Sequence, residues 1–172
     1  MKIGILTFLF GCFFALSSFS QVNTLGKDFY VAFMENGRSL DSVNTAPEKA
    51  LIMITAAEKT VGMIETPREV IPFELEKGQS FSKEFEANAE GLIHPISGEI
   101  DQRKIHVTST GLIAVHAMNG RAYSSDGTVV LPTPALGFDY MVFTHHEKVW
   151  VTGSTLNHTM LESAFVIVAT DD

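Results

Sequence analysis

The sequence contains a single cysteine, Cys12, in 172 residues. One thiol cannot form an internal disulfide, and it cannot supply the thiolate set of a zinc or iron–sulfur site. Cys12 also lies in an N-terminal stretch that we expect to be removed from the mature chain. The mature chain would then have no thiolate ligand and no cysteine nucleophile, and its stability would rest on apolar burial and β-pairing.

Basic side chains are also few. Twelve Lys and Arg stand against twenty Asp and Glu, which gives a formal net charge of −8. A phosphate backbone or an anionic membrane surface repels such a chain, so we expect neither as a partner. A modest negative charge is also ordinary for a soluble protein, and it does not by itself indicate a ligand.

The N-terminus has the three parts of a secretory signal peptide. A positive start precedes an apolar stretch, Ile3–Leu16, and Ser17–Ser20 then places small residues before the cut. The apolar stretch is too short to span a bilayer comfortably. We therefore predict a signal peptide over residues 1–20 and a secreted or cell-surface chain with no transmembrane segment after cleavage. Leu9–Cys12 leaves a lipoprotein signal as the alternative.

Helical periodicity is scarce in the rest of the chain, and turn residues interrupt it at short intervals. About ten short segments rich in β-branched and aromatic residues are typical of strands. They are 28–34, 49–55, 60–66, 69–75, 80–85, 103–108, 112–118, 128–131, 148–151 and 161–169. This pattern predicts an all-β fold, an antiparallel β-sandwich or a barrel-like domain.

Local features refine this expectation. The continuous apolar run 49–55 predicts a strand buried on both faces. Pro72 places its strand at an edge or at a bulge, because proline cannot donate to a β-ladder. Ser109–Gly111 predicts a hairpin turn between the strands on either side of it. Residues 86–102 and 119–127 are expected to be exposed loops.

One short pattern occurs twice. Leu25–Val31 and Leu136–Val142 share Leu, Gly, Asp, an aromatic residue and Val at the same positions, and apolar runs follow at Leu51–Glu58 and Phe165–Asp172. The repeated order of these segments predicts two related β units. The second is incomplete, because the sequence ends where the first unit continues. We therefore expect residues 21–172 to form a single β domain, the N-terminal part of a longer one.

Six stretches, in this order, carry a family resemblance. They are Gly26–Phe33, Ile105–Ser109, Ile113–Asn119, Ser125–Pro132, Leu136–Val142 and Ser163–Thr170. The chain resembles the IgG-Fc-binding-protein N-terminal domain family, as an exported bacterial-type member that is apparently truncated. The resemblance implies a binding or adhesion role, with an extracellular glycoprotein, a mucin or immunoglobulin Fc as partner.

Six histidines raise the question of a metal site. His106 and His116 flank the predicted hairpin turn and could face each other, but two imidazoles fall short of the three or four ligands of a zinc site. His145 and His146 are adjacent, so their rings would point to opposite faces of a strand. We expect no metal and no cofactor.

No pattern in the sequence predicts catalysis. Ser124 and Ser125 beside Asp126 offer hydroxyls and a carboxylate, but there is no Gly-x-Ser-x-Gly elbow and nothing places a histidine nearby. Paired carboxylates for glycoside cleavage would have to come from acids around the long loop, which are usually only solvated. These acids are Glu84, Glu86, Glu90, Glu99 and Asp101. We predict no catalytic residue.

The repeated acids and rings have structural interpretations. Asp28 and Asp139 each follow the glycine of the doubled pattern, where an aspartate typically bonds a nearby backbone N–H. We expect the neighbouring rings to be core residues, namely Phe29, Tyr30, Tyr140 and Phe143.

Three functions remain open at this point. The favoured one is an exported, non-enzymatic binding or adhesion module that recognises a protein or a glycan. The alternatives are a structural segment of a larger cell-surface protein and, less favoured, a secreted carbohydrate-active enzyme. No residue of a ligand-binding site is predicted.

Overall fold

A computed structural model describes residues 23–36, 47–94, 96–121, 124–143, 148–152, 157–161 and 165–170. The predicted signal peptide and His145 and His146 lie outside these ranges. The strands are β1 Leu25–Val31, β2 Phe33–Met34, β3 Lys49–Ala56, β4 Thr60–Glu65, β5 Val70–Leu75, β6 Ser80–Glu86, β7 Ile93–His94, β8 Ile105–Arg121, β9 Ser124–Val130, β10 Lys148–Thr152 and β11 Asn157–Leu161. A single turn of 3₁₀-helix, η1, covers Thr133–Ala135. The fold is all-β, as predicted.

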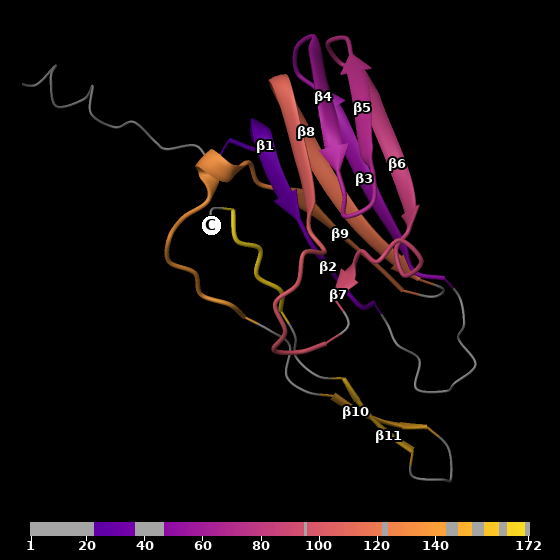
Figure 1. Ribbon diagram of the computed structural model, residues 1–172. Helices are drawn as coiled ribbons and strands as arrows, with labels where there is room; N and C mark the ends of the chain where they lie inside the picture. Colours follow the sequence, from indigo (N-terminus) through magenta and orange to yellow (C-terminus); the bar gives the residue numbers. More distant parts are fainter. Residues whose placement is uncertain are drawn as a thin grey trace, which may run out of the picture.

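The long strand β8 organises the main sheet, which has seven strands. Its first half lies between β1 and β4, and its second half lies between β9 and β3. Strand β5 continues the sheet beyond β4, and β6 continues it beyond β3. All these pairings are antiparallel, and the two halves curve into a nearly closed, barrel-like sheet (Figure 1).

Two small sheets accompany the main one. Strands β2 and β7 pair in parallel, and β10 and β11 form an antiparallel pair. The predicted strand at 148–151 is thus confirmed within β10. Pro72 lies in β5, which pairs only with β4 among the described strands, so its predicted place at an edge is also confirmed. No helix of the described ranges is long and apolar enough to cross a membrane.

The predicted hairpin at Ser109–Gly111 is wrong, because β8 runs through these residues without a reversal. Side chains from the β3–β4 turn region replace ladder partners here: Gly111 N–H donates to the Thr60 hydroxyl, and Leu112 N–H donates to the Glu58 carboxylate. Position 111 requires a glycine, because residues of the β3–β4 turn region pass close to its Cα. A Cβ at Gly111 would lie 2.9 Å from the Lys59 carbonyl oxygen.

A second correction concerns residues 119–127, which were expected to form a loop. Strand β8 extends to Arg121 and β9 begins at Ser124, so most of this stretch belongs to a β-ladder. Asn119 pairs with Asp126, and Met118 with Gly127. Residues 125–127 of β9 are exposed, whereas residues 119–121 of β8 are partly buried.

The doubled pattern does not give two equivalent units in the part of the chain that the structure describes. Leu25–Val31 forms β1, whereas residues 136–143 follow η1 without forming a strand. Residues 165–170 are likewise not in a strand, although 51–56 lies in β3. The physical reason lies in the sheet, because both edges of β8 are already occupied along most of its length and offer no place for a second copy of β1.

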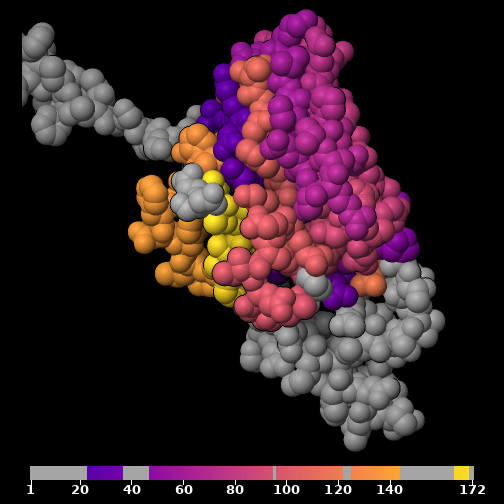
Figure 2. Space-filling model, viewed as in Figure 1, coloured from indigo at the N-terminus to yellow at the C-terminus, as the bar shows by residue number. Residues whose placement is uncertain are grey.

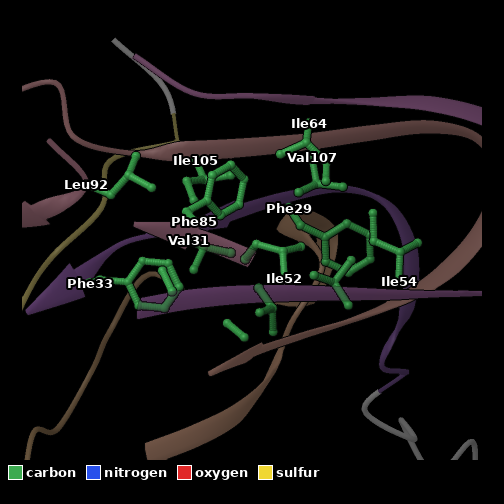
Figure 3. Close-up of a cluster of buried hydrophobic side chains, with 14 of the residues drawn as sticks. Phe29, Val31, Phe33, Ile52, Ile54, Ile64, Phe85, Leu92, Ile105 and Val107 are labelled. Atoms are coloured by element: carbon green, nitrogen blue, oxygen red, sulfur yellow. The ribbon is translucent and has the colours of Figure 1, made fainter. Parts of the chain in front are cut away.

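The core lies between the two halves of the curved sheet (Figure 3). Strands contribute alternate residues, as expected for a sheet with one buried face. In β3, for example, Ile52 and Ile54 are fully buried while Met53 is exposed. The prediction that this strand is buried on both faces is therefore wrong. Other fully buried side chains are Phe29, Ile64, Leu92, Ile105, Val107, Ile113 and Val115.

Candidate functional site: the His106 cluster and an exposed apolar segment

A group of charged and aromatic side chains in mutual contact lies on the outer face of the first half of the sheet. His106 of β8 stands opposite Tyr30 of β1 on one side and opposite Glu65 of β4 on the other. Asp28 lies two residues before Tyr30 on the same face of β1. Lys104 just precedes β8. We call these five residues the His106 cluster.

Both ring nitrogens of His106 face carboxylates. Nε2 lies 2.6 Å from Asp28 Oδ1, and Nδ1 lies 3.1 Å from Glu65 Oε2. Because an ionised carboxylate only accepts hydrogen bonds, the donor in such a contact is a ring N–H of His106. The histidine is thus a bridge between β1 and β4, which do not pair with each other.

Asp28 is held in its ionised form by its neighbours. Partial burial alone would raise the pKa of its carboxyl group. Hydrogen bonds from Thr133 and His106, together with the positive charge of the imidazolium, outweigh this effect and lower the pKa below its ordinary value. The Thr133 hydroxyl also lies 3.2 Å from the Asp28 backbone oxygen, so η1 is anchored to β1 at this point.

The ring of Tyr30 lies against a histidine and a lysine. Its ring stacks on His106, with centroids 4.2 Å apart and an angle of 6° between the planes. The Lys104 ammonium lies 5.3 Å from the centroid of the same ring. Cations over an aromatic face are attracted by the ring quadrupole. Tyr30 was expected in the core, but it is only partly buried and belongs to this outer cluster.

The His106 cluster can bind a ligand or hold neighbouring strands together, but it is poorly suited to proton transfer. A general base needs a nitrogen or carboxylate within reach of the proton it removes. In the His106 cluster both imidazole nitrogens are directed at carboxylates of the same chain. The cluster therefore joins strands and presents charge, and it offers no nitrogen to a substrate.

The structure changes the roles predicted for several of these residues. His106 and His116 do not face each other across a turn, because they lie ten positions apart on one strand and pair with different neighbours. Asp28 does not cap a turn, because it sits within β1 and contacts His106 across the sheet. Glu65 and Lys104 belong to no sequence motif that would indicate a functional role. Only the register of β4 against β8 identifies Glu65.

A second surface feature is an apolar segment that does not enter the core. Residues 136–143 are all exposed, and they include a fully exposed Phe138 and an 85% exposed Phe143. Tyr140 and Phe143 were predicted as core residues, and that prediction is wrong. Asp139 is the only charged residue of the segment. Figure 2 shows it in orange as an outer ridge, with residues 165–170 in yellow on the same side of the molecule.

Phe165 and Ile167 extend the apolar character of this side, since both are largely exposed. Monomeric proteins seldom leave several large apolar side chains together in water unless a partner covers them. We use the name apolar segment for residues 136–143 only.

Three of the five acids named as candidates for catalytic pairs have structural partners. Glu84 forms an ion pair with Lys49 across β3 and β6. Glu90 accepts a hydrogen bond from the Glu86 N–H, 2.9 Å away. Asp101 contacts His94 and Arg103, each at 3.0 Å.

Ser125 and Asp126 lie on β9, opposite Gly120 and Asn119, and this places them on the half of β8 that does not carry His106. Within the described ranges, no group of three or more His, Cys, Asp or Glu residues is arranged to hold a metal ion.

One carboxylate is fully buried at the other end of β8. Glu48 Oε1 accepts a hydrogen bond from the Asn36 N–H at 2.6 Å, while its Oε2 has no hydrogen-bond partner. Asn36 and Asn119 lie close by and exchange hydrogen bonds with the backbone of β8 and β2, which closes this end of the core with polar groups.

Comparison with known proteins adds little to these observations. No family model and no curated protein matches the chain. The crystal structure of Thermotoga maritima 1070 matches 61% of this chain and 92% of its own, with 14% sequence identity and a TM-score of 0.33. A similarity this low supports no inference about fold or function. The resemblance to the IgG-Fc-binding family therefore stays a prediction.

Proposed function

We propose that the protein is an exported, non-enzymatic binding or adhesion module whose apolar segment docks on an extracellular glycoprotein. The observation that carries this proposal is the exposure of the apolar segment, above all of Phe138 and Phe143. The signal-peptide pattern of residues 1–20 supports an extracellular setting.

Burial of the apolar segment in an interface would contribute favourably to binding. Burying an aromatic side chain removes about 150–250 Å² from water. Full burial of a phenylalanine ring contributes roughly 1.5–3 kcal/mol before the costs of association are subtracted. Two rings in the centre of an interface would act as its energetic hot spot.

The composition of the segment favours a protein surface over a sugar as the contact. Leu136, Met141 and Val142 stand among the rings, and Asp139 supplies the only charge. Aromatic residues and methionine are enriched at protein interfaces, whereas charged residues are depleted from their centres. The family resemblance suggests the glycoproteins to be tested, immunoglobulin Fc and mucin.

Binding to immobilised Fc and to immobilised mucin tests the proposal. The chain is expected to bind at least one of them saturably, and Phe138→Ser/Phe143→Ser should weaken that binding at least tenfold. Ile100→Ser is the matched control, because Ile100 is almost fully exposed on another loop. Deglycosylated mucin should bind as well as native mucin if the contact is to protein. Binding to neither glycoprotein, or equal binding by the double variant, would refute the proposal.

The two alternative functions make different predictions. A purely structural segment of a larger protein should bind neither glycoprotein. A carbohydrate-active enzyme should turn over a polysaccharide and lose this activity in Glu-to-Gln variants. The ion pair of Glu84 and the backbone contact of Glu90 favour structural roles for two of the candidate acids.

A further inference from the structure

Two methionines and one histidine come together on the outer face of the second half of the sheet. Met53 of β3 pairs directly with His116 of β8. Met118 lies two residues beyond His116 on β8, so its side chain emerges on the same face. This trio is separate from the His106 cluster and from the apolar segment, because it lies over β3, β8 and β9.

All three side chains are accessible. Met53 and Met118 are about equally exposed, at 41% and 40%, and His116 is also exposed. His116 has no hydrogen bond or ion pair within the described residues, in contrast to His94 and His106. Its ring nitrogens are therefore available to a ligand.

The spacing suits joint coordination of one ion. Directly opposite residues of an antiparallel pair have Cβ atoms about 4.5–5.5 Å apart, and diagonal neighbours about 7–8 Å. Met53 and Met118 are diagonal neighbours, because Met118 stands opposite Leu51. Methionine has three rotatable bonds and a polarizable sulfur, so both thioethers can reach an ion bound at the imidazole.

The side chains around the trio carry no competing ligand. Val129 flanks His116 from β9, and Ser82 flanks Met53 from β6. The nearest acid on this face, Glu84, is paired with Lys49. Hard cations such as calcium and magnesium need several carboxylate or carbonyl oxygens, which this face does not provide.

We propose that Met53, His116 and Met118 form a surface site for a soft monovalent metal ion, Cu(I). Thioethers are soft ligands that select Cu(I), and imidazole also suits copper. The site needs no cysteine, which is consistent with an exported chain that retains no thiol after cleavage. It departs from the sequence-based expectation of no metal, which considered imidazole and thiolate ligands of zinc but no thioether. The proposal does not depend on the proposed binding function.

Titration of the purified chain with Ag⁺, a redox-inert probe of the same class, and with Cu⁺ held by a competing chelator tests the site. One ion per chain is expected. The methyl resonances of Met53 and Met118 and the ring resonances of His116 should shift together in NMR spectra. Each of Met53→Leu, Met118→Leu and His116→Gln should weaken binding at least tenfold.

Met63→Leu is the matched control, because Met63 is a similarly exposed methionine on β4, outside the trio. It should bind the ion as tightly as the unchanged chain.

The proposal is wrong if no 1:1 complex forms, or if the three variants bind like the unchanged chain. It is equally wrong if Met63→Leu weakens binding as much as the trio variants do. Circular dichroism of each variant shows whether it is folded. Because Leu and Met have similar volumes and these sites are partly exposed, the leucine variants are expected to fold.

Discussion

Replacing His106 tests the bridge between β1 and β4. We expect His106→Gln to lose two ion pairs and one ring stack. The side chains of Asp28 and Glu65 are 38% and 43% exposed, so each ion pair is screened by solvent and contributes about 0.2–1 kcal/mol. A stacked ring pair adds about 0.5–1.5 kcal/mol. The free energy of unfolding should therefore fall by about 1–3 kcal/mol, measured by urea denaturation.

A double-mutant cycle isolates the Asp28–His106 term from other effects of the substitution. Asp28→Asn, His106→Gln and the double variant should show a coupling free energy of about 0.5–1 kcal/mol at neutral pH, the upper part of the range for partly exposed pairs. Glu69→Gln is the control. Glu69 forms another exposed ion pair, with Lys83, and this pair does not contact His106. A coupling free energy indistinguishable from zero would refute the bridge.

The contribution of Asp28 to the free energy of unfolding depends on pH with a definite sign. The folded-state pKa of Asp28 is lowered, so its contribution to stability is complete above the unfolded-state value of about 3.9. It is lost as the pH falls through the lower folded-state pKa. The difference in unfolding free energy between the unchanged chain and Asp28→Asn should therefore shrink on acidification below about pH 4. A difference that grows there would contradict the geometry.

Three further predictions test the sheet and its surface by urea denaturation. Gly111→Ala should destabilise the fold by about 1–3 kcal/mol, since its Cβ has no room beside Lys59, whereas Gly120→Ala, with open space around it, should not. Ile54→Ala should cost about 2–5 kcal/mol and Met53→Ala less than about 1 kcal/mol, and equal costs would contradict the alternation of β3. Phe138→Ser should change stability by no more than about 0.5 kcal/mol, and a larger loss would place Phe138 in the core.

Local chemistry was sufficient to predict most of the strands. β-branched and aromatic runs bounded by turn residues predicted β3, β4, β5 and β6 to within a residue or two, and the missing N–H of Pro72 predicted the edge position of β5. Each of these features acts within one strand and its immediate neighbours.

Long-range pairing explains what the sequence did not reveal. Ser109–Gly111 has the composition of a turn, but the N–H groups of Gly111 and Leu112 are satisfied by Thr60 and Glu58 from the β3–β4 turn region, so β8 continues. The His106 cluster depends on the register of β1 and β4 against β8, which no local pattern records. Leu136–Val142 has the composition of β1 but no free edge of β8 to pair with, so its rings remain in solvent.

Amide hydrogen exchange tests the central claim, that the apolar segment is a docking surface. Exchange is measured on the chain alone and in complex with whichever glycoprotein, Fc or mucin, it binds. The account predicts that amides of residues 136–143, which form no β-ladder, become protected in the complex while those of β5 and β6 are unchanged. Protection at the His106 cluster alone, or no protection of residues 136–143, would contradict it.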